Sequence, residues 1–150
     1  MDIVDTDLAP FEEIRDGESV LAIILRNSYS EPGVHFFSEN HFSQQLGFVQ
    51  HPAGYSIAPH VHNAVPREVV YTQEVLFVRR GRVRVDLYRD DHSVVTSRIL
   101  SSGDVIFLPE GGHGFEVLED SQIIEVKQGP YAGDDDKTRF EPGPRGVPPK

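Results

Sequence analysis

Two histidines separated by one residue, His60 and His62, have the type and spacing that permit metal chemistry. They follow Pro59, and their neighbours favour an extended backbone. In an extended strand, residues two positions apart point to the same face, so both imidazoles can approach one ion. The chain has no cysteine, which leaves His, Asp and Glu as its strong side-chain ligands. The pair therefore indicates a metal site built from nitrogen and oxygen donors.

A longer spacing pattern surrounds this pair. Gly54 stands six positions before His60, and Glu74 stands seven positions before Gly81. A second block, residues 103–116, reads Gly-Asp-Val-Ile-Phe-Leu-Pro-Glu-Gly-Gly-His-Gly-Phe-Glu. The two blocks resemble the two sequence motifs of the cupin superfamily, and the match begins at Gly54 and ends with the second block. In this respect the chain is similar to small single-domain cupins that bind a metal.

The cupin resemblance implies a particular set of metal ligands. His60 and His62 correspond to the paired imidazole ligands. Glu74 corresponds to the carboxylate ligand, and His113 corresponds to the third imidazole. These donors suit one divalent transition metal, with Fe(II) as the first expectation and Zn(II), Mn(II), Ni(II) or Co(II) as alternatives. Four protein ligands leave coordination positions open for water, substrate or dioxygen, which is more typical of a catalytic site than of a structural one.

The chain departs from the cupin pattern in two places. Eleven residues separate His62 from Glu74, where three or four are usual in the family. The departure implies an inserted loop, residues 63–72, which we expect at the mouth of the barrel. Glu68 lies in this loop and competes for the carboxylate role, but only Glu74 has the family's spacing to a glycine. The second block is one residue shorter than usual before His113.

The loop and the flanking strands supply further candidates. Glu68 and Tyr71 are candidates for a general acid or base, because the loop would place them near the metal. Arg67 is a candidate for holding a substrate carboxylate or phosphate in a two-pronged contact, with a solvated loop arginine as the alternative. Aromatic residues on strands first of all serve packing, and they can also line a pocket. The aromatic candidates for substrate binding are Phe77, Phe107 and Phe115.

The elements that must position these residues are short β-strands. Residues 82–88 alternate charged and apolar side chains, which places Val83, Val85 and Leu87 on one face. Many such runs at intervals of about ten residues favour a sandwich or barrel. The cupin resemblance narrows this to an all-β double-stranded β-helix, the jelly-roll barrel. The other expected strands are residues 19–26, 44–50, 69–79, 94–100, 104–108, 115–118 and 123–127.

The connections and the ends complete the expected organisation. Residues 89–93 are expected to form a hairpin loop, and residues 79–81 a tight turn in which Gly81 takes a positive φ. One helical turn is expected within residues 9–14. We expect a single barrel domain over residues 1–131 with an N-terminal extension. Residues 132–150, rich in Gly, Pro and acidic side chains, are expected to form a poorly ordered tail or a strap along the barrel.

Composition restricts the class of protein. The 150 residues carry a formal charge of −10, and an acidic surface repels nucleic acid phosphates and acidic lipid headgroups. We therefore expect neither nucleic acid nor membrane partners. The N-terminus lacks the basic and apolar regions of a secretion signal, so we expect a cytoplasmic protein. A homodimer is also expected, because many cupin barrels pair through their sheets.

Three functions are compatible with the sequence. The first is a metal-dependent enzyme acting on a small molecule as an oxygenase, isomerase or lyase, with a dioxygenase expected if the metal is iron. The second is a protein that binds a sugar or an organic acid without turnover. The third is a structural protein whose barrel serves mainly for dimerisation. One barrel supports many chemistries, so the fold does not select among them.

Overall fold

The chain folds as an all-β protein, which confirms the expected class. The computed structural model describes residues 8–142, and these contain short and long strands and a single 3₁₀ helix. In the described part of the chain, no helix is long and apolar enough to cross a membrane. The elements are β1 (Phe11–Asp16), β2 (Ser19–Leu25), β3 (Gly33–Phe36), β4 (Gly47–Gln50), β5 (Glu74–Tyr88), β6 (Val94–Ser101), β7 (Val105–Leu108), β8 (Gly112–Lys127) and η1 (Gly133–Asp136).

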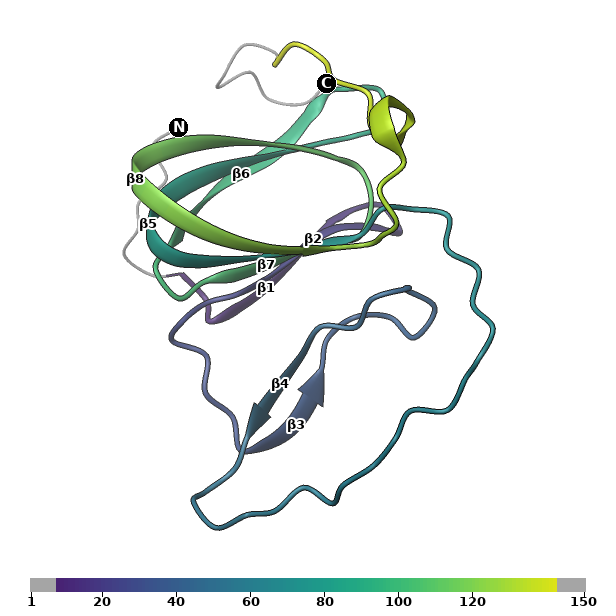
Figure 1. Ribbon diagram of the computed structural model, residues 1–150. Coiled ribbons are helices and arrows are strands. Elements are labelled where there is room, and N and C mark those ends of the chain that lie inside the picture. The colour runs from purple at the N-terminus through teal and green to yellow at the C-terminus, as the bar shows by residue number, and fades with distance from the viewer. Residues whose placement is uncertain (1–7, 143–150) are drawn as a thin grey trace.

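The strands form one curled antiparallel sheet and one separate hairpin. In the sheet, the order is β1-β2-β7-β5-β6, and β8 pairs with β5 outside this path. β5 is the central strand: its first half pairs with β7, its second half pairs with β6, and β8 follows it along nearly its whole length. β3 and β4 pair only with each other, and their hairpin lies below the curled sheet in Figure 1.

The curl of the β5–β8 pair originates in the middle of both strands. The register between them shifts three times between Val78 and Val83, which marks bulges that bend the strands and increase their twist. Gly81 lies at this bend with φ +96°, a conformation that side chains strongly disfavour. A Cβ on Gly81 would also collide with the Ser121 side chain and the Asp120 carbonyl oxygen. The glycine is therefore required for the bend.

Replacing Gly81 with alanine should lower the free energy of unfolding by about 2–3 kcal/mol, because the substitution adds a steric collision to an unfavourable φ. Gly17 provides a matched control, since it has φ +60° and open space around its Cβ position. Gly17→Ala should lower the free energy of unfolding by only about 1 kcal/mol, because it introduces an unfavourable φ without a collision. Urea denaturation measures the free energy of unfolding of both variants. Equal losses of stability in the two variants would contradict the proposed collision at Gly81.

The buried hydrophobic residues form two clusters. The larger cluster contains fully buried residues of β2, β5, β6 and β7, including the three residues expected on one face of 82–88: Val83, Val85 and Leu87. The smaller cluster joins Phe107 of β7 to Val20, Ile23 and Leu46. The alternation read from the sequence thus predicts the buried face of β5 correctly.

Two expectations about local structure were wrong. The segment expected to make a helical turn, residues 9–14, instead contributes to β1, which pairs with β2 from Phe11 to Asp16. The expected turn at residues 79–81 is a bulge inside the continuous strand β5, although Gly81 takes the expected positive φ. The hairpin loop at residues 89–93 is confirmed, with backbone hydrogen bonds from Arg89 to Ser93 and from His92 to Arg89.

Asp136 and Phe140, near the end of the described residues, contact other parts of the chain. Thr72 Oγ1 donates a hydrogen bond of 2.8 Å to Asp136. Phe140 packs edge-on against Tyr88 and stacks on His92, with ring centroids 4.0 Å apart in the stack. Residues 143–150 of the expected tail, and residues 1–7 of the expected N-terminal extension, lie outside the described residues.

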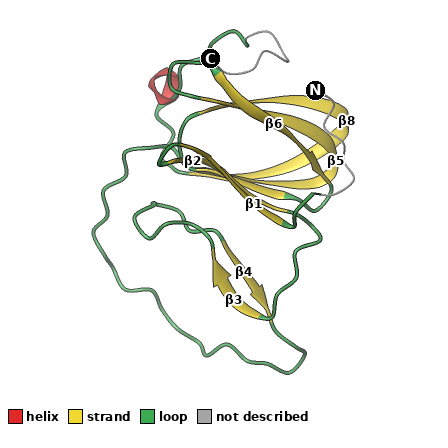
Figure 2. Cartoon of the chain, turned by 180° about the vertical axis from the view of Figure 1, so that it is seen from behind, coloured by secondary structure: helices red, strands yellow, loops and turns green. Residues whose placement is uncertain are grey.

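A long segment without strands, residues 51–73, joins β4 to β5. Figures 1 and 2 show that this segment runs away from the curled sheet and passes around the β3–β4 hairpin. Residues 63–72 are a loop, as expected, but they belong to this segment and do not lie at the mouth of a closed barrel. The strand expected at residues 69–79 begins only at Glu74.

Candidate functional site

The first candidate site is a carboxylate–imidazole pair at the two ends of the β5–β8 curl. Glu74 is the first residue of β5 and His113 the second residue of β8, where the strand register places His113 opposite Leu87. Their side chains nevertheless meet, with His113 Nε2 3.0 Å from Glu74 Oε2. The curl brings them together, because it returns the far end of the strand pair to its beginning.

The pair lies in a partly sheltered position. The Glu74 side chain is 12% exposed and the His113 side chain 30%. The hydrogen bond from His113 lowers the pKa of the Glu74 carboxyl, while partial burial acts in the opposite direction. The charge of Lys127 also lowers the pKa of Glu74. The carboxylate form is therefore favoured, which is the form needed for accepting a proton or binding a metal.

The spacing of the two donors is compatible with a shared metal ion. Two donors that each lie about 2.1 Å from one ion, at right angles, are about 3.0 Å apart. The same separation is that of an ordinary hydrogen bond, which is the contact that the two side chains make in this structure.

The histidines of the long segment lie elsewhere. His60 and His62 are both exposed, and their ring centroids are 5.3 Å apart. His60 Nδ1 lies 2.8 Å from the Ala58 carbonyl oxygen. Because a carbonyl only accepts, Nδ1 carries a proton, which leaves Nε2 as the ring nitrogen able to bind a metal.

Of the four expected ligands, Glu74 and His113 are in contact, whereas His60 and His62 lie apart from them on the long segment. Within residues 8–142, no three His, Asp or Glu side chains form a group able to hold a metal ion. Glu68 is not beside His113: the carboxylate in contact with this imidazole is Glu74. The structure brings together the two expected ligands that lie on strands and leaves apart the two that lie on the long segment.

The remaining expected residues are distributed over the molecule. Arg67 is exposed, and its Nη1 lies 3.5 Å from the Val65 carbonyl oxygen. Phe107 is fully buried in the smaller core cluster, a packing position. Phe115 is 37% exposed and lies 5.8 Å from the His113 ring, measured between ring centroids. Phe77 is half-buried in β5.

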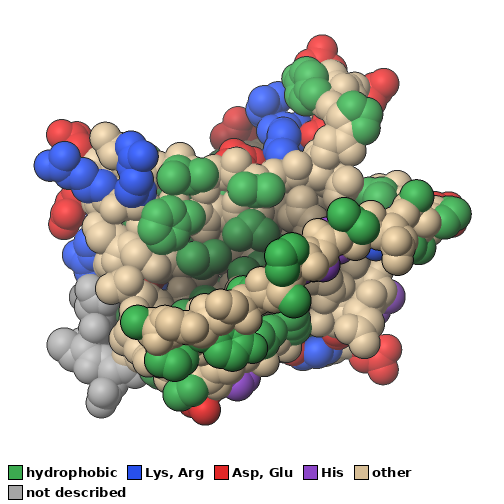
Figure 3. All heavy atoms as spheres, turned by 60° about the horizontal axis from the view of Figure 1, so that its bottom comes forward, with side chains coloured by type: hydrophobic (Ala, Val, Ile, Leu, Met, Phe, Trp, Pro, Cys, Tyr) green, Lys and Arg blue, Asp and Glu red, His purple; other side chains and the backbone are tan. Residues whose placement is uncertain are grey.

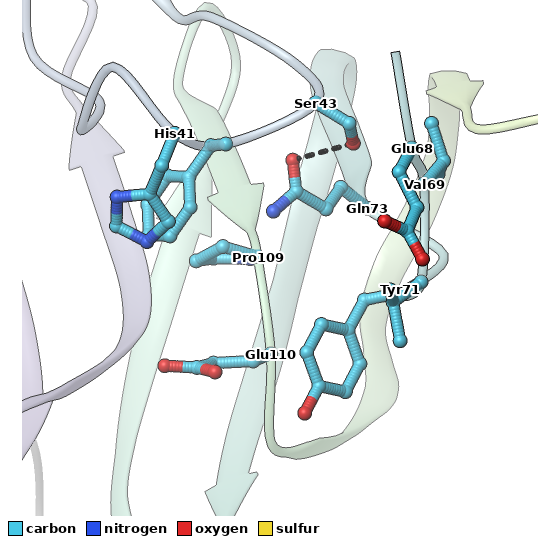
Figure 4. A pocket seen from close by; sticks show the side chains of 10 residues that line it. His41, Ser43, Glu68, Val69, Tyr71, Gln73, Pro109 and Glu110 are labelled. Carbon is cyan, nitrogen blue, oxygen red and sulfur yellow. Dashed lines mark hydrogen bonds between the residues drawn. The ribbon is translucent and has the colours of Figure 1, made fainter.

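A second candidate site is a cavity of about 210 Å³ that Gln73 lines. Neither Glu74 nor His113 lines this cavity. Glu68 and Tyr71, the expected acid–base candidates, do line it (Figure 4). The sequence did not indicate the other polar lining residues, because they come from separate loops. These are His41, Ser43, Gln73 and Glu110.

Fold and sites together describe an all-β protein with a curled antiparallel half-barrel, one carboxylate–imidazole pair and one polar cavity. Comparison of the chain with protein-family models, with curated proteins and with solved structures found no match.

Proposed function

We propose that the protein is a metal-dependent enzyme for a small-molecule substrate, of the cupin type, with Glu74 and His113 as the fixed half of its metal site. The observation that carries the proposal is the 3.0 Å contact between these two side chains. The sequence motifs select the same two residues. The bound ion would supply Lewis-acid activation of water or substrate or, if it is iron, dioxygen chemistry.

His60 and His62 would complete the site when the long segment docks onto the curled sheet. Two exposed apolar surfaces support this docking. β8 pairs with β5 along one edge, and no described strand pairs with its other edge. Side chains of β8 are exposed by 36–60%: Phe115, Val117, Leu118, Ile123, Ile124 and Val126.

The long segment has its own exposed apolar residues, among them Tyr55, Ile57 and Val61. Figure 3 shows hydrophobic side chains both along the chain that crosses this side of the molecule and in the hollow behind it. Burying apolar surface is worth about 25 cal/mol per Å², so contact between the two surfaces is favourable. Pairing with the free edge of β8 would also satisfy its backbone groups. The closed form would be the double-stranded β-helix.

The length of the segment permits this movement. Eleven residues lie between His62 and the first residue of β5, and an extended chain spans up to about 3.5 Å per residue, so His62 can reach points up to about 40 Å from Glu74. The entropy lost when the segment is ordered opposes docking in the absence of metal. Metal binding by His60 and His62 would offset that loss.

The absence of cysteine allows a direct test of docking by spin labels at introduced cysteines. We expect labels at Val61 and Val117 to move closer together when Zn(II) is added. A pair at Val117 and Tyr131, both outside the long segment, should keep its distance. The change should also be absent when His113→Ala is added to the labelled chain. A Val61–Val117 distance that does not respond to Zn(II) would contradict the proposed assembly.

The second candidate function, binding of a small molecule without turnover, is favoured by the cavity beside Gln73, which the metal ligands do not line. In that case a bound ligand should be retained with equal affinity after the protein is treated with a chelator. Under the enzyme proposal, chelation should abolish turnover.

A further inference from the structure

The cavity beside Gln73 contains a buried amide whose hydrogen bonds are only half satisfied. Gln73 is 4% exposed. Its Oε1 accepts hydrogen bonds from the Gln44 backbone N–H at 2.9 Å and from Ser43 Oγ at 3.0 Å. The backbone N–H can only donate, so the oxygen of the amide must face it, and the orientation of the group is fixed. The two N–H donors of Gln73 Nε2 therefore point the other way.

These donors face the cavity. Figure 4 shows the Gln73 nitrogen turned away from Ser43, toward the space beside His41 and Pro109. Within the described residues, no side chain or backbone oxygen accepts a hydrogen bond from this nitrogen. This nitrogen is not among the fully buried atoms that lack a partner, so it is accessible from the cavity, and a ligand's acceptor oxygen would take the hydrogen bond that it otherwise donates to solvent.

The charge of the residues that line the cavity favours one sign of charge on the ligand. Glu68 and Glu110 contribute two carboxylates, and no Lys or Arg lines the cavity. His41, the basic residue of the lining, lies 3.3 Å from Glu39, which provides it with an anionic neighbour. The potential inside the cavity therefore favours a cation over an anion.

Size and wall chemistry restrict the ligand further. A volume of about 210 Å³ holds several water molecules or one small organic molecule, since a water takes about 30 Å³ in the liquid. Phe42, Tyr71 and Pro109 supply apolar faces against which C–H groups can pack. We propose that this cavity binds a small organic amine that also carries hydroxyl groups, such as an amino sugar or an amino alcohol.

The roles in this complex follow from the donors present. The ammonium group of the ligand would bind to the carboxylate of Glu68 or of Glu110. A hydroxyl oxygen would accept the hydrogen bond from Gln73 Nε2. None of the proposed metal ligands lines the cavity, but Glu68 and Tyr71 belong to the long segment that metal binding would move. The proposal therefore concerns the metal-free form, and its test is made with a chelator so that its outcome is separate from that of the metal-dependent function.

The test is a titration of the ¹⁵N-labelled full chain with glucosamine, in the presence of a chelator, followed by two-dimensional NMR. The side-chain amide pair of Gln73 is the readout, assigned by its disappearance in Gln73→Glu. We expect glucosamine to shift this pair saturably at millimolar concentrations. Glucose, which lacks the amine, and N-acetylglucosamine, whose amide is uncharged, should bind at least about tenfold more weakly, because neither has the cation that the carboxylates attract.

A charge-removing variant tests the carboxylates separately. Glu68→Gln combined with Glu110→Gln should weaken glucosamine binding about tenfold, whereas the exposed Glu18→Gln on the β1–β2 turn should leave it unchanged. Three results would each overturn the proposal: a Gln73 amide that glucosamine does not move, equal binding of glucose, or unchanged affinity in the double variant. The spectra also report whether each variant retains its fold.

Discussion

Asp104→Ala should lower the free energy of unfolding by about 3–5 kcal/mol, one of the largest effects of any single substitution in this chain. Asp104 and Arg26 form a buried ion pair of 3.0 Å, with side chains 7% and 5% exposed. The carboxylate also accepts backbone hydrogen bonds from Asn27 and Ser101. Removing it would leave the Arg26 charge buried without its partner.

The Arg26 guanidinium makes this loss more severe. Its Nε and Nη2 are buried without a hydrogen-bond partner among the contacts of the structure, so Asp104 carries most of the compensation for this charge. Denaturation by urea measures the effect. Arg26→Met combined with Asp104→Ala should recover part of the stability, because no buried charge remains. Asp91→Ala, in the exposed 89–93 loop, is the matched control and should cost much less. A loss below about 1 kcal/mol in Asp104→Ala would contradict the account of the ion pair.

The second large effect concerns the metal. His113→Ala and Glu74→Ala should each lower the affinity for Co(II) more than about 100-fold, since even the loss of an outer hydrogen-bond partner typically costs 10–100-fold. Titration followed by the visible absorption of Co(II) measures the affinity. His60→Ala and His62→Ala should also weaken binding and should change the spectrum, because each removes a nitrogen donor.

His35→Ala is the matched control for this series. The His35 ring contacts the Pro32 carbonyl oxygen on the separate β3–β4 hairpin, away from Glu74. Its affinity for Co(II) should equal that of the parent. If His113→Ala binds Co(II) as the parent does, the carboxylate–imidazole pair is a structural hydrogen bond and the proposed metal site is wrong.

The sequence allowed correct prediction of the features that depend on local pattern. Alternation predicted which face of β5 is buried. Spacing to a glycine selected Glu74 over Glu68 as the carboxylate that would bind a metal together with His113, and that role stays a prediction. The structure places Glu74, and not Glu68, in contact with that imidazole. The positive φ of Gly81 was also predicted, although the tight turn from which it was inferred is a bulge inside β5.

Features that depend on contacts between distant segments could not be predicted in this way. Residues 11–16 became a strand because β2 offers them a partner, which local propensity does not reveal. The polar floor at Gln73 depends on Ser43 and Gln44, some thirty residues earlier. The curl that brings Glu74 to His113 depends on three register shifts between β5 and β8. Gly81 marks their place in the sequence, but the shifts themselves cannot be read from it.

The central claim is that Glu74 and His113 hold a metal together with His60 and His62. Its most direct test is elemental analysis of the protein purified without added metal, in parallel with His113→Ala, His60→Ala and His35→Ala. The account predicts about one equivalent of a transition metal in the parent and in His35→Ala, with little in the other two variants. Iron would favour dioxygen chemistry, and zinc, manganese or nickel would favour Lewis-acid chemistry. Equal metal content in all four proteins, or none in the parent even after anaerobic addition of these metals, would contradict it.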